Sequence, residues 1–252
     1  MLPRPGRLNC IRCFSQDACA FDRAAETVGE WRIVNNPLAW GNPQAEVVVL
    51  GFSKGPNQQG GLATRPVSEV AFQGGRLPLA KILHHIGLIR APRKEILDQC
   101  IADASGRFHF GSLVRCSVER FDRKKQEWTG TGAGMLDRYI QSPFGDRVVS
   151  NCIDQHLGSL PTNTKLVIML GMGSGGNYIK TCKAAFARAL GGSWHTINEV
   201  AYSDGKRTFV HTEHFKSQGA HLPNWLSEDR HNRGRFGLLA REAVAGSGVI
   251  TA

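Results

Sequence analysis

Cysteines are the residues of this chain whose spacing most plainly suggests chemistry. Two of them form the pair Cys10-Ile-Arg-Cys13, Cys116 ends an apolar stretch, and Cys152 lies near the start of a predicted helix. Four thiolates can gather at one place if the N-terminal segment packs across that edge of the fold. Four cysteines suit a tetrahedral zinc ion or a [4Fe–4S] cluster. Because a single Cys-x-x-Cys pair is also compatible with a redox pair or with chance, these readings stay open here.

The total number of cysteines bears on the same question. The chain has seven, which is an odd number. Its N-terminus lacks the apolar region of a secretory signal, and no apolar run approaches the roughly 20 residues that span a membrane. We therefore expect a cytoplasmic protein, in which disulfides are disfavoured and metal or cluster ligation is the better explanation of the cysteines.

The elements that must position these residues alternate between strand and helix. Buried apolar runs predict strands at 46–51, 107–115, 164–171 and 207–214, and helical spacing predicts helices at 76–89, 147–160 and 177–190. This alternation favours an α/β fold with its site at the carboxyl ends of parallel strands. We expect a single domain over 1–252, built as a three-layer α/β/α sandwich with a central, mainly parallel four-stranded sheet.

Three segments fall outside the alternation. Residues 1–45 are predicted to be an irregular, cluster-binding segment, 117–146 an inserted basic loop, and 226–252 a C-terminal tail that is helical and basic over most of its length. The formal charge of the chain is +10, from 31 Lys and Arg against 21 Asp and Glu. Such a balance favours a polyanionic partner. An acidic membrane surface is less favoured, because no long basic amphipathic helix is evident.

The cysteines and four further segments together resemble the uracil-DNA glycosylase superfamily, and most of all its iron–sulfur members. The segments are GNPQAEVVVLG, AFQGGRLPLAKILHHIGL, CIDQHLGSLPTNTKLVIMLG and the end of FVHTEH. The resemblance covers about residues 10 to 220. It implies a [4Fe–4S] cluster held by Cys10, Cys13, Cys116 and Cys152, and DNA as the partner, either single- or double-stranded. We expect the protein to be a monomer.

The resemblance also implies roles for three residues at strand ends and turns. Phe72, in AFQG, matches the phenylalanine that stacks on a flipped base, although a phenylalanine is more often part of a core. His214 matches the histidine that donates a hydrogen bond to a base oxygen as charge builds. Its place at the end of the strand favours it over His211. Phe52 takes the place of a residue that contacts the base.

The sequence departs from the family pattern at two places in the pocket. Ser53 stands where the family has a water-positioning carboxylate or amide, and it is a poor general base, so Asn57 is a second candidate. Ser112, preceded by Gly111, stands where an asparagine usually reads the edge of uracil. A serine cannot pair bidentately, and the smaller pair leaves room. Unless the register is wrong by one residue, this predicts a base that is bulkier than uracil.

Basic residues near the site are expected to contact DNA, because cations meet phosphates there. They are Lys54 and Lys216 near strand ends, and Arg120, Arg123 and Lys124 in segment 117–146. Trp128 in the same segment could stack on a base. The alternative for the segment is a solvated loop with a packed tryptophan.

These expectations combine into one function. We expect a monofunctional DNA glycosylase that flips out a modified pyrimidine and hydrolyses its N-glycosidic bond, leaving an abasic site. A modified cytosine of phage DNA, removed in bacterial defence, is one substrate class that the resemblance implies. The alternatives are a uracil-DNA glycosylase of base-excision repair, a non-catalytic protein that binds modified DNA, and a zinc-stabilised nucleic-acid module.

Overall fold

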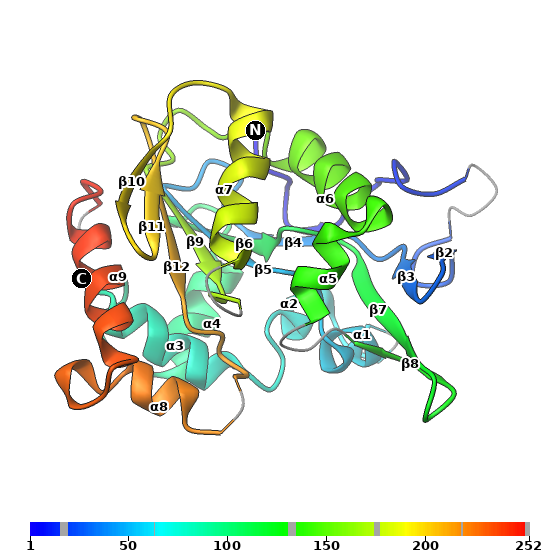
Figure 1. Cartoon of the computed structure of the whole chain (residues 1–252), viewed down its shortest axis with the longest axis horizontal. Coiled ribbons are helices and arrows are strands. Elements are labelled where there is room, and N and C mark those ends of the chain that lie inside the picture. The colour runs from blue at the N-terminus through cyan, green and yellow to red at the C-terminus, as the bar shows by residue number, and fades with distance from the viewer. Residues whose placement is uncertain (16–19, 63, 131–134, 174–176, 218, 250–252) are drawn as a thin grey trace.

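The chain folds around one large β-sheet, and a computed structural model describes residues 1–15, 20–62, 64–130, 135–173, 177–217 and 219–249. The described strands of the sheet follow the order β1-β4-β6-β5-β9-β12-β11-β10 (Figure 1). The middle four are parallel: β6 (Phe108–Ser112), β5 (Val47–Gly51), β9 (Leu166–Leu170) and β12 (Thr208–Thr212). The outer ones are antiparallel: β1 (Gly6–Arg7), β4 (Leu38–Gly41), β11 (Ala201–Ser203) and β10 (His195–Asn198).

The four predicted strands are confirmed as the parallel centre of this sheet. The prediction that the sheet has only four strands is wrong, because two antiparallel strands extend each edge in the described part of the chain. β4 was not predicted, because it lies within the turn-rich stretch NNPLAWGNPQ and ends at Gly41. That glycine has a φ of +75°, and a Cβ at this position would lie 2.3 Å from the backbone oxygen of Phe108. A strand of four residues that ends at such a glycine is too short to show a periodic apolar pattern in the sequence.

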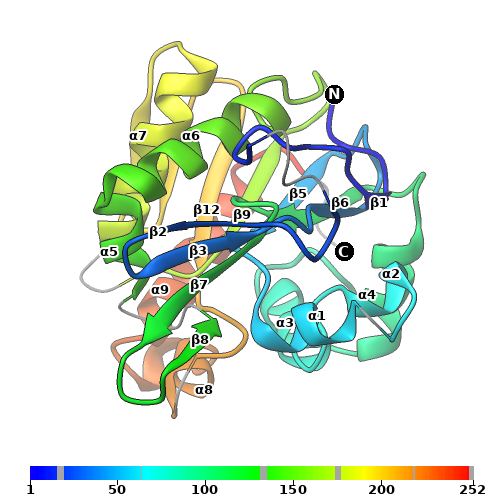
Figure 2. The ribbon, with the colours of Figure 1, turned by 90° about the vertical axis from the view of Figure 1, so that its right-hand side faces the viewer.

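Helices cover both faces of the sheet, so the predicted three-layer α/β/α sandwich is confirmed (Figures 1 and 2). Side chains of β5 alternate between two cores: Val47 and Val49 face one, and Val48 and Leu50 face the other. The first core is covered by α1 (Pro56–Gly61), α2 (Val67–Val70), α3 (Arg76–His85), α4 (Lys94–Ala102), α8 (His221–Trp225) and α9 (Gly234–Ala245). The second is covered by α5 (Met135–Gln141), α6 (Pro143–His156) and α7 (Asn177–Leu190).

Local signals set the helix boundaries. α7 coincides with the prediction, whereas α6 begins four residues earlier than predicted. The reason is an N-cap, because the Ser142 hydroxyl accepts a hydrogen bond from the Gly145 amide at 3.0 Å and Pro143 occupies the first turn. The C-terminal tail is helical as predicted, with a short 3₁₀ turn, η1 (Glu228–Arg230), before α9. No helix in the described ranges is long and apolar enough to cross a membrane.

A second, smaller sheet corrects two of the segment predictions. It contains β2 (Ala25–Val28), β3 (Trp31–Val34), β7 (Ser117–Asp122) and β8 (Glu127–Gly130), in that order. Residues 1–45 are therefore not irregular throughout, and 117–146 is not a loop but a β-hairpin followed by α5 and the start of α6. Figure 2 shows the β7–β8 hairpin projecting beyond the main sheet. The hairpin was not predicted as strands, because its many charged residues obscure the alternation of apolar residues in the sequence.

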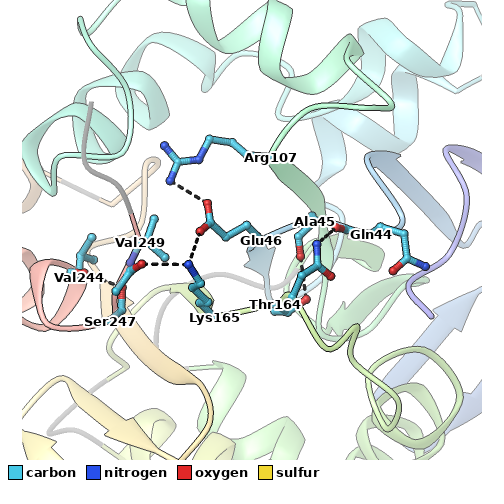
Figure 3. A network of polar contacts seen from close by, with 11 residues as sticks. Gln44, Ala45, Glu46, Arg107, Thr164, Lys165, Val244, Ser247 and Val249 are labelled. Atoms are coloured by element: carbon cyan, nitrogen blue, oxygen red, sulfur yellow. Dashed lines mark hydrogen bonds and ion pairs between the residues drawn. The ribbon is translucent and has the colours of Figure 1, made fainter.

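The amino ends of the central strands are joined by a network of polar contacts (Figure 3). Glu46, just before β5, accepts from Arg107 before β6 at 3.1 Å and pairs with Lys165 before β9 at 3.1 Å. The Thr164 hydroxyl donates to the backbone oxygen of Ala45 at 2.7 Å. These bonds fix the register of the strands at one end of the sheet, so the opposite, carboxyl end is left for the connecting loops.

The order of the parallel strands places a crevice at that carboxyl end. Along the chain, β5 connects to β6 on one side of it, and the chain then crosses to β9 and β12 on the other side. In open α/β sheets, ligands bind outside the carboxyl ends of the strands where the order reverses. This topology points to the loops that follow β5, β9 and β12.

Candidate functional site

The loop after β5 continues alongside β6 for several residues. The Leu113 amide donates to the backbone oxygen of Gly51, and the Val114 amide donates to that of Phe52, both at 2.8 Å. Lys54 then forms an isolated parallel bridge with Ser117. The segment Gly51–Lys54 is therefore held as an extension of the sheet.

Phe72 lies in the turn between α2 and α3, and its backbone is strained. Its φ is +50°, which is uncommon for a bulky residue and requires support from the surroundings. The ring makes edge-to-face contacts with Phe110 at 5.9 Å and with Phe215 at 5.6 Å, measured between ring centroids. The residue is only 3% exposed, so a base can stack on it only if a neighbouring side chain moves. The Phe72 ring therefore packs between β6 and the segment that follows β12.

His214 follows β12 and is held from two sides. Its backbone amide donates to Oε1 of Glu213 at 3.1 Å, and the other oxygen of this carboxylate accepts from Nε of Arg233 at 2.6 Å. The imidazole stacks on the ring of Phe215 at 4.4 Å. Phe215 in turn packs against Gly75, where a Cβ would lie 2.2 Å from the ring.

The hydrogen bonds of His214 define its tautomer. Nδ1 accepts from the Lys216 amide at 3.1 Å, so the ring proton of the neutral imidazole is on Nε2. Burial lowers the pKa of His214 to about 4, with the Lys216 ammonium acting in the same direction and Glu213 against it. At neutral pH the side chain is therefore an uncharged donor.

His211 is a structural residue by comparison. Its Nδ1 contacts the backbone oxygen of Gly171 at 3.0 Å, and its Nε2 contacts the Tyr202 hydroxyl at 3.3 Å. It is fully buried in the second core. The choice of His214 over His211 as the histidine at the strand end therefore agrees with their surroundings.

Gly111 and Ser112 lie on opposite faces of β6, because successive residues of a strand alternate. Ser112 is on the side of Phe110 and Phe72. Gly111 is on the side of α6, and a Cβ there would lie 1.6 Å from Nη1 of Arg115. The prediction that Gly111 makes room for a base is therefore wrong, because the guanidinium of Arg115 fills that space.

Phe52 is packed in the second core. Its ring makes edge-to-face contacts with Tyr139 at 5.9 Å and with Tyr178 at 6.1 Å. The predicted contact of this side chain with a base is not supported by its position, because the ring points away from Ser112. Ser53 is half-buried at the end of the sheet extension. Asn57 belongs to α1, and its side chain lies outside what the structure describes.

Thiols from three segments meet beside α6. The Cys152 thiol hydrogen-bonds to Cys13, and this bond lowers the pKa of Cys13 to about 6 despite burial. The Asn151 amide also donates to Sγ of Cys13, at 3.5 Å. Cys116 lies close enough to Cys13 and Cys10 to interact with them electrostatically, and burial raises its pKa to about 12. In the described ranges, no three His, Cys, Asp or Glu side chains are arranged to hold a single metal ion.

Lys54 does not face solvent, so its predicted contact with DNA is wrong. It is 2% exposed, and its ammonium donates to the backbone oxygen of Arg115. Burial lowers its pKa to about 8. The side chain turns inward because the segment Gly51–Lys54 follows the sheet rather than forming an open loop. Lys216, by contrast, is exposed.

The basic residues of the hairpin have different surroundings. Arg120 forms an ion pair with Glu30 at 2.7 Å. Arg123 and Lys124 are exposed at the turn between β7 and β8. Arg120, Arg123 and Lys124 contribute to the wall of a hollow of about 310 Å³. Trp128 is half-buried against Phe121, with the guanidinium of Arg32 over its ring at 4.4 Å.

The sequence reasoning missed three residues near the site: Arg115, Glu213 and Phe215. Arg115 precedes a cysteine, and buried arginines are too rare to be expected from sequence. Glu213 was available as the carboxylate next to His214. Phe215 could have been found as an apolar residue directly after a buried strand, a place that predicts packing.

Comparisons with known proteins give a likeness to solved structures alone. No family model and no curated protein matches the chain. Among solved structures, the crystal structure of wild-type Pedobacter heparinus SMUG2 is similar over 81% of this chain and 76% of that chain, with a TM-score of 0.40 and 11% sequence identity. A likeness of this size carries no argument about activity.

The surroundings of Gly111 lead to a prediction. Gly111→Ala should destabilise the protein by about 2–4 kcal/mol, because the methyl group displaces a buried guanidinium. Ser112→Ala, one residue along on the other face, should cost about 1 kcal/mol or less because it removes only a hydroxyl. Denaturant unfolding of both variants measures the difference. Equal stability of Gly111→Ala and the unsubstituted protein would mean that the space beside Gly111 is open.

Proposed function

We propose that this protein is a monofunctional DNA glycosylase that binds an extruded, modified pyrimidine at the carboxyl end of its parallel strands. The observation that carries the proposal is His214, an uncharged imidazole with its proton on Nε2, held at the end of β12 beside the aromatic pair Phe72 and Phe215. The sequence resemblance to the uracil-DNA glycosylase superfamily at the same two positions, Phe72 and His214, supports it independently.

The chemistry of base release explains why such a histidine is useful. As the N-glycosidic bond breaks, positive charge develops on the sugar and negative charge on the departing base. A donor fixed in advance at the position of the developing anion stabilises the transition state more than the ground state. His214 is fixed in this way by Glu213, Arg233 and the Lys216 amide. A neutral donor does this without placing a proton on the base.

The choice of base follows from Ser112. In the proposed pocket its hydroxyl replaces an amide and offers one donor and two acceptor lone pairs. This favours a pyrimidine whose edge differs from that of uracil, and a modified cytosine is the class that we propose. Removal of such a base from phage DNA would make the protein part of antiviral defence. Uracil, and with it DNA repair, is the alternative.

The water that attacks the sugar is proposed to lie near Ser53. Its hydroxyl can orient water but is a poor base. Asn57 on α1 is the other proposed residue. Because formation of the sugar cation dominates the barrier, a weak water-positioning group is compatible with the reaction.

The four cysteines are proposed to hold a [4Fe–4S] cluster. The donors fit this group: Cys13 and Cys152 share a hydrogen bond, and Cys13 and Cys10 lie within electrostatic reach of Cys116. When bound, the cluster would join the N-terminal segment, the start of β7 and α6. Its role there is structural.

Base release from defined oligonucleotides tests the activity. The substrates carry uracil, or hydroxymethylcytosine with and without glucose, in single- and double-stranded form. His214→Ala should lower the rate of release by about 10²–10³-fold, the usual loss for one transition-state donor, and should leave DNA affinity nearly unchanged. His195→Ala, an exposed histidine of β10, is the matched control.

Three results of this assay have different consequences. Release confined to modified cytosine supports the reading of Ser112. Release of uracil alone contradicts that reading and assigns the protein to repair. Binding of the modified strand without alkali-labile sites contradicts the glycosylase and leaves a modified-DNA-binding protein.

The pH dependence of base release follows from the low pKa of His214. Because the folded pKa is about 4, the imidazole stays neutral as pH falls, and kcat/KM should show no loss from this group down to about pH 5. Lys216→Met removes a nearby cation, so it should raise the pKa and move the acid limb to higher pH. An acid limb near the ordinary histidine pKa of about 6.5 in the unsubstituted protein would contradict the neutral-donor role.

The hairpin turn is proposed to contact phosphates. Replacing both Arg123 and Lys124 with Ala should reduce the slope of log K against log salt by about 1.8, since each phosphate contact contributes about 0.9 on duplex DNA. Lys206→Ala, an exposed lysine at the opposite edge of the sheet, should change the slope much less. Affinity measured over a series of salt concentrations gives the slopes. Identical slopes for all three proteins would exclude the hairpin from the DNA interface.

A further inference from the structure

Two cations are buried side by side next to the cysteines. Arg115 is 1% exposed and Lys54 is 2% exposed. The Lys54 ammonium donates to the backbone oxygen of Arg115, so the two residues are in direct contact. The Arg115 charge acts electrostatically on Lys54, and two buried positive charges this close in the fold need a negative partner.

Neither cation has a carboxylate partner among the described residues. No salt bridge of Lys54 or Arg115 with an acidic side chain occurs in the described ranges, and Nε and Nη1 of Arg115 have no hydrogen-bond acceptor there. The Asp22 carboxylate acts on Lys54 only weakly, as the smallest of the electrostatic contributions to its pKa, and it already accepts from the Asn36 amide at 2.8 Å.

The remaining neighbours are neutral or are thiols. Nη2 of Arg115 lies 3.4 Å from Nε2 of His109, which is fully buried, and His156 of α6 is also near. Arg115 directly precedes Cys116, and Lys54 is bridged to Ser117 on the other side of the same cysteine. As thiolates, Cys152 would attract Arg115, and Cys116 and Cys152 would attract Lys54. The negative charge that compensates both cations must therefore come from the thiol side.

The fold reserves this place for a guanidinium. Gly111 is the residue that leaves room for it, because a Cβ there would overlap Nη1. The guanidinium lies on the α6 side of β6, opposite the face that carries Ser112 and Phe110. It is consequently a neighbour of the cysteines and not of the proposed base pocket.

We propose that Lys54 and Arg115 are the counter-charges of the anionic metal centre formed by Cys10, Cys13, Cys116 and Cys152, and that they set its reduction potential and its retention. The inference rests on the [4Fe–4S] cluster of the proposed function. An oxidised cluster with four thiolates is doubly negative, so two cations balance it, and they stabilise the more negative reduced state still more. A zinc ion with four thiolates has the same net charge but no reduction potential.

Purified protein tests this through iron content and the cluster potential. Lys54→Met and Arg115→Met should each lose iron several-fold faster to a chelator. Each should also lower the reduction equilibrium constant about tenfold or more, which is about 60 mV for a one-electron couple. Arg115→Lys keeps the charge and should stay close to the unsubstituted protein in both measurements. Lys206→Met is the surface control.

The outcomes separate this inference from the proposed activity. Unchanged iron retention and potential in Lys54→Met would overturn it, as would an Arg115→Lys variant that is as damaged or as insoluble as Arg115→Met, because shape rather than charge would then matter. If Lys54→Met is insoluble, the comparison of the two Arg115 variants decides. Unsubstituted protein that contains stoichiometric zinc and no iron would also overturn it. Base release is scored separately, so a protein that holds iron but releases no base would refute only the activity.

Discussion

The structure depends on the parallel pairing of β5 with β6 on one side and β9 on the other. β5 is buried on both faces, and its side chains alternate between the two cores. Because the central strands are parallel, the loops that follow them all begin at the same end of the sheet, the carboxyl end of the strands. Residues separated by more than a hundred positions, such as Phe72 and Phe215, therefore come into contact there. The strained backbone of Phe72 is supported by this crowding.

The alternation of side chains along β6 then divides that edge into two compartments. Phe110 and Ser112 face α1–α4 and the aromatic residues around His214. His109 and Gly111 face α6, with Arg115 and the cysteines beyond them. A single strand thus separates the proposed base pocket from the proposed metal site. A change at Ser112 alters the first compartment and a change at Gly111 the second, although the two residues are adjacent in sequence.

How much of this was predictable from sequence depends on the kind of signal. Apolar runs identified β5 and β9, which are buried on both faces, and the apolar-rich segments 107–115 and 207–214 identified β6 and β12. His214 was predicted from its place at the end of a strand and Phe72 from the AFQG turn, and the structure brings both close to Phe215. The edge strands and the β7–β8 hairpin were missed, because short, half-exposed strands carry little apolar periodicity. The burial of Lys54 gave no signal at all, since lysine is almost always exposed and only the bridge to Ser117 turns it inward.

The inward position of Lys54 links the two compartments. Lys54 directly follows Ser53, the residue proposed to position water, and its ammonium is anchored on the backbone of Arg115. The conformation of the loop after β5 therefore depends on a cation that is stable in the interior only if an anion lies nearby. Cys116 and Cys152 are the groups that can supply this anion, and they do so as thiolates, the form in which cysteines bind a metal. In this arrangement the proposed metal centre would take no part in the chemistry, yet it would affect where the loop after β5 lies, because it would balance the charge that holds the loop against the sheet.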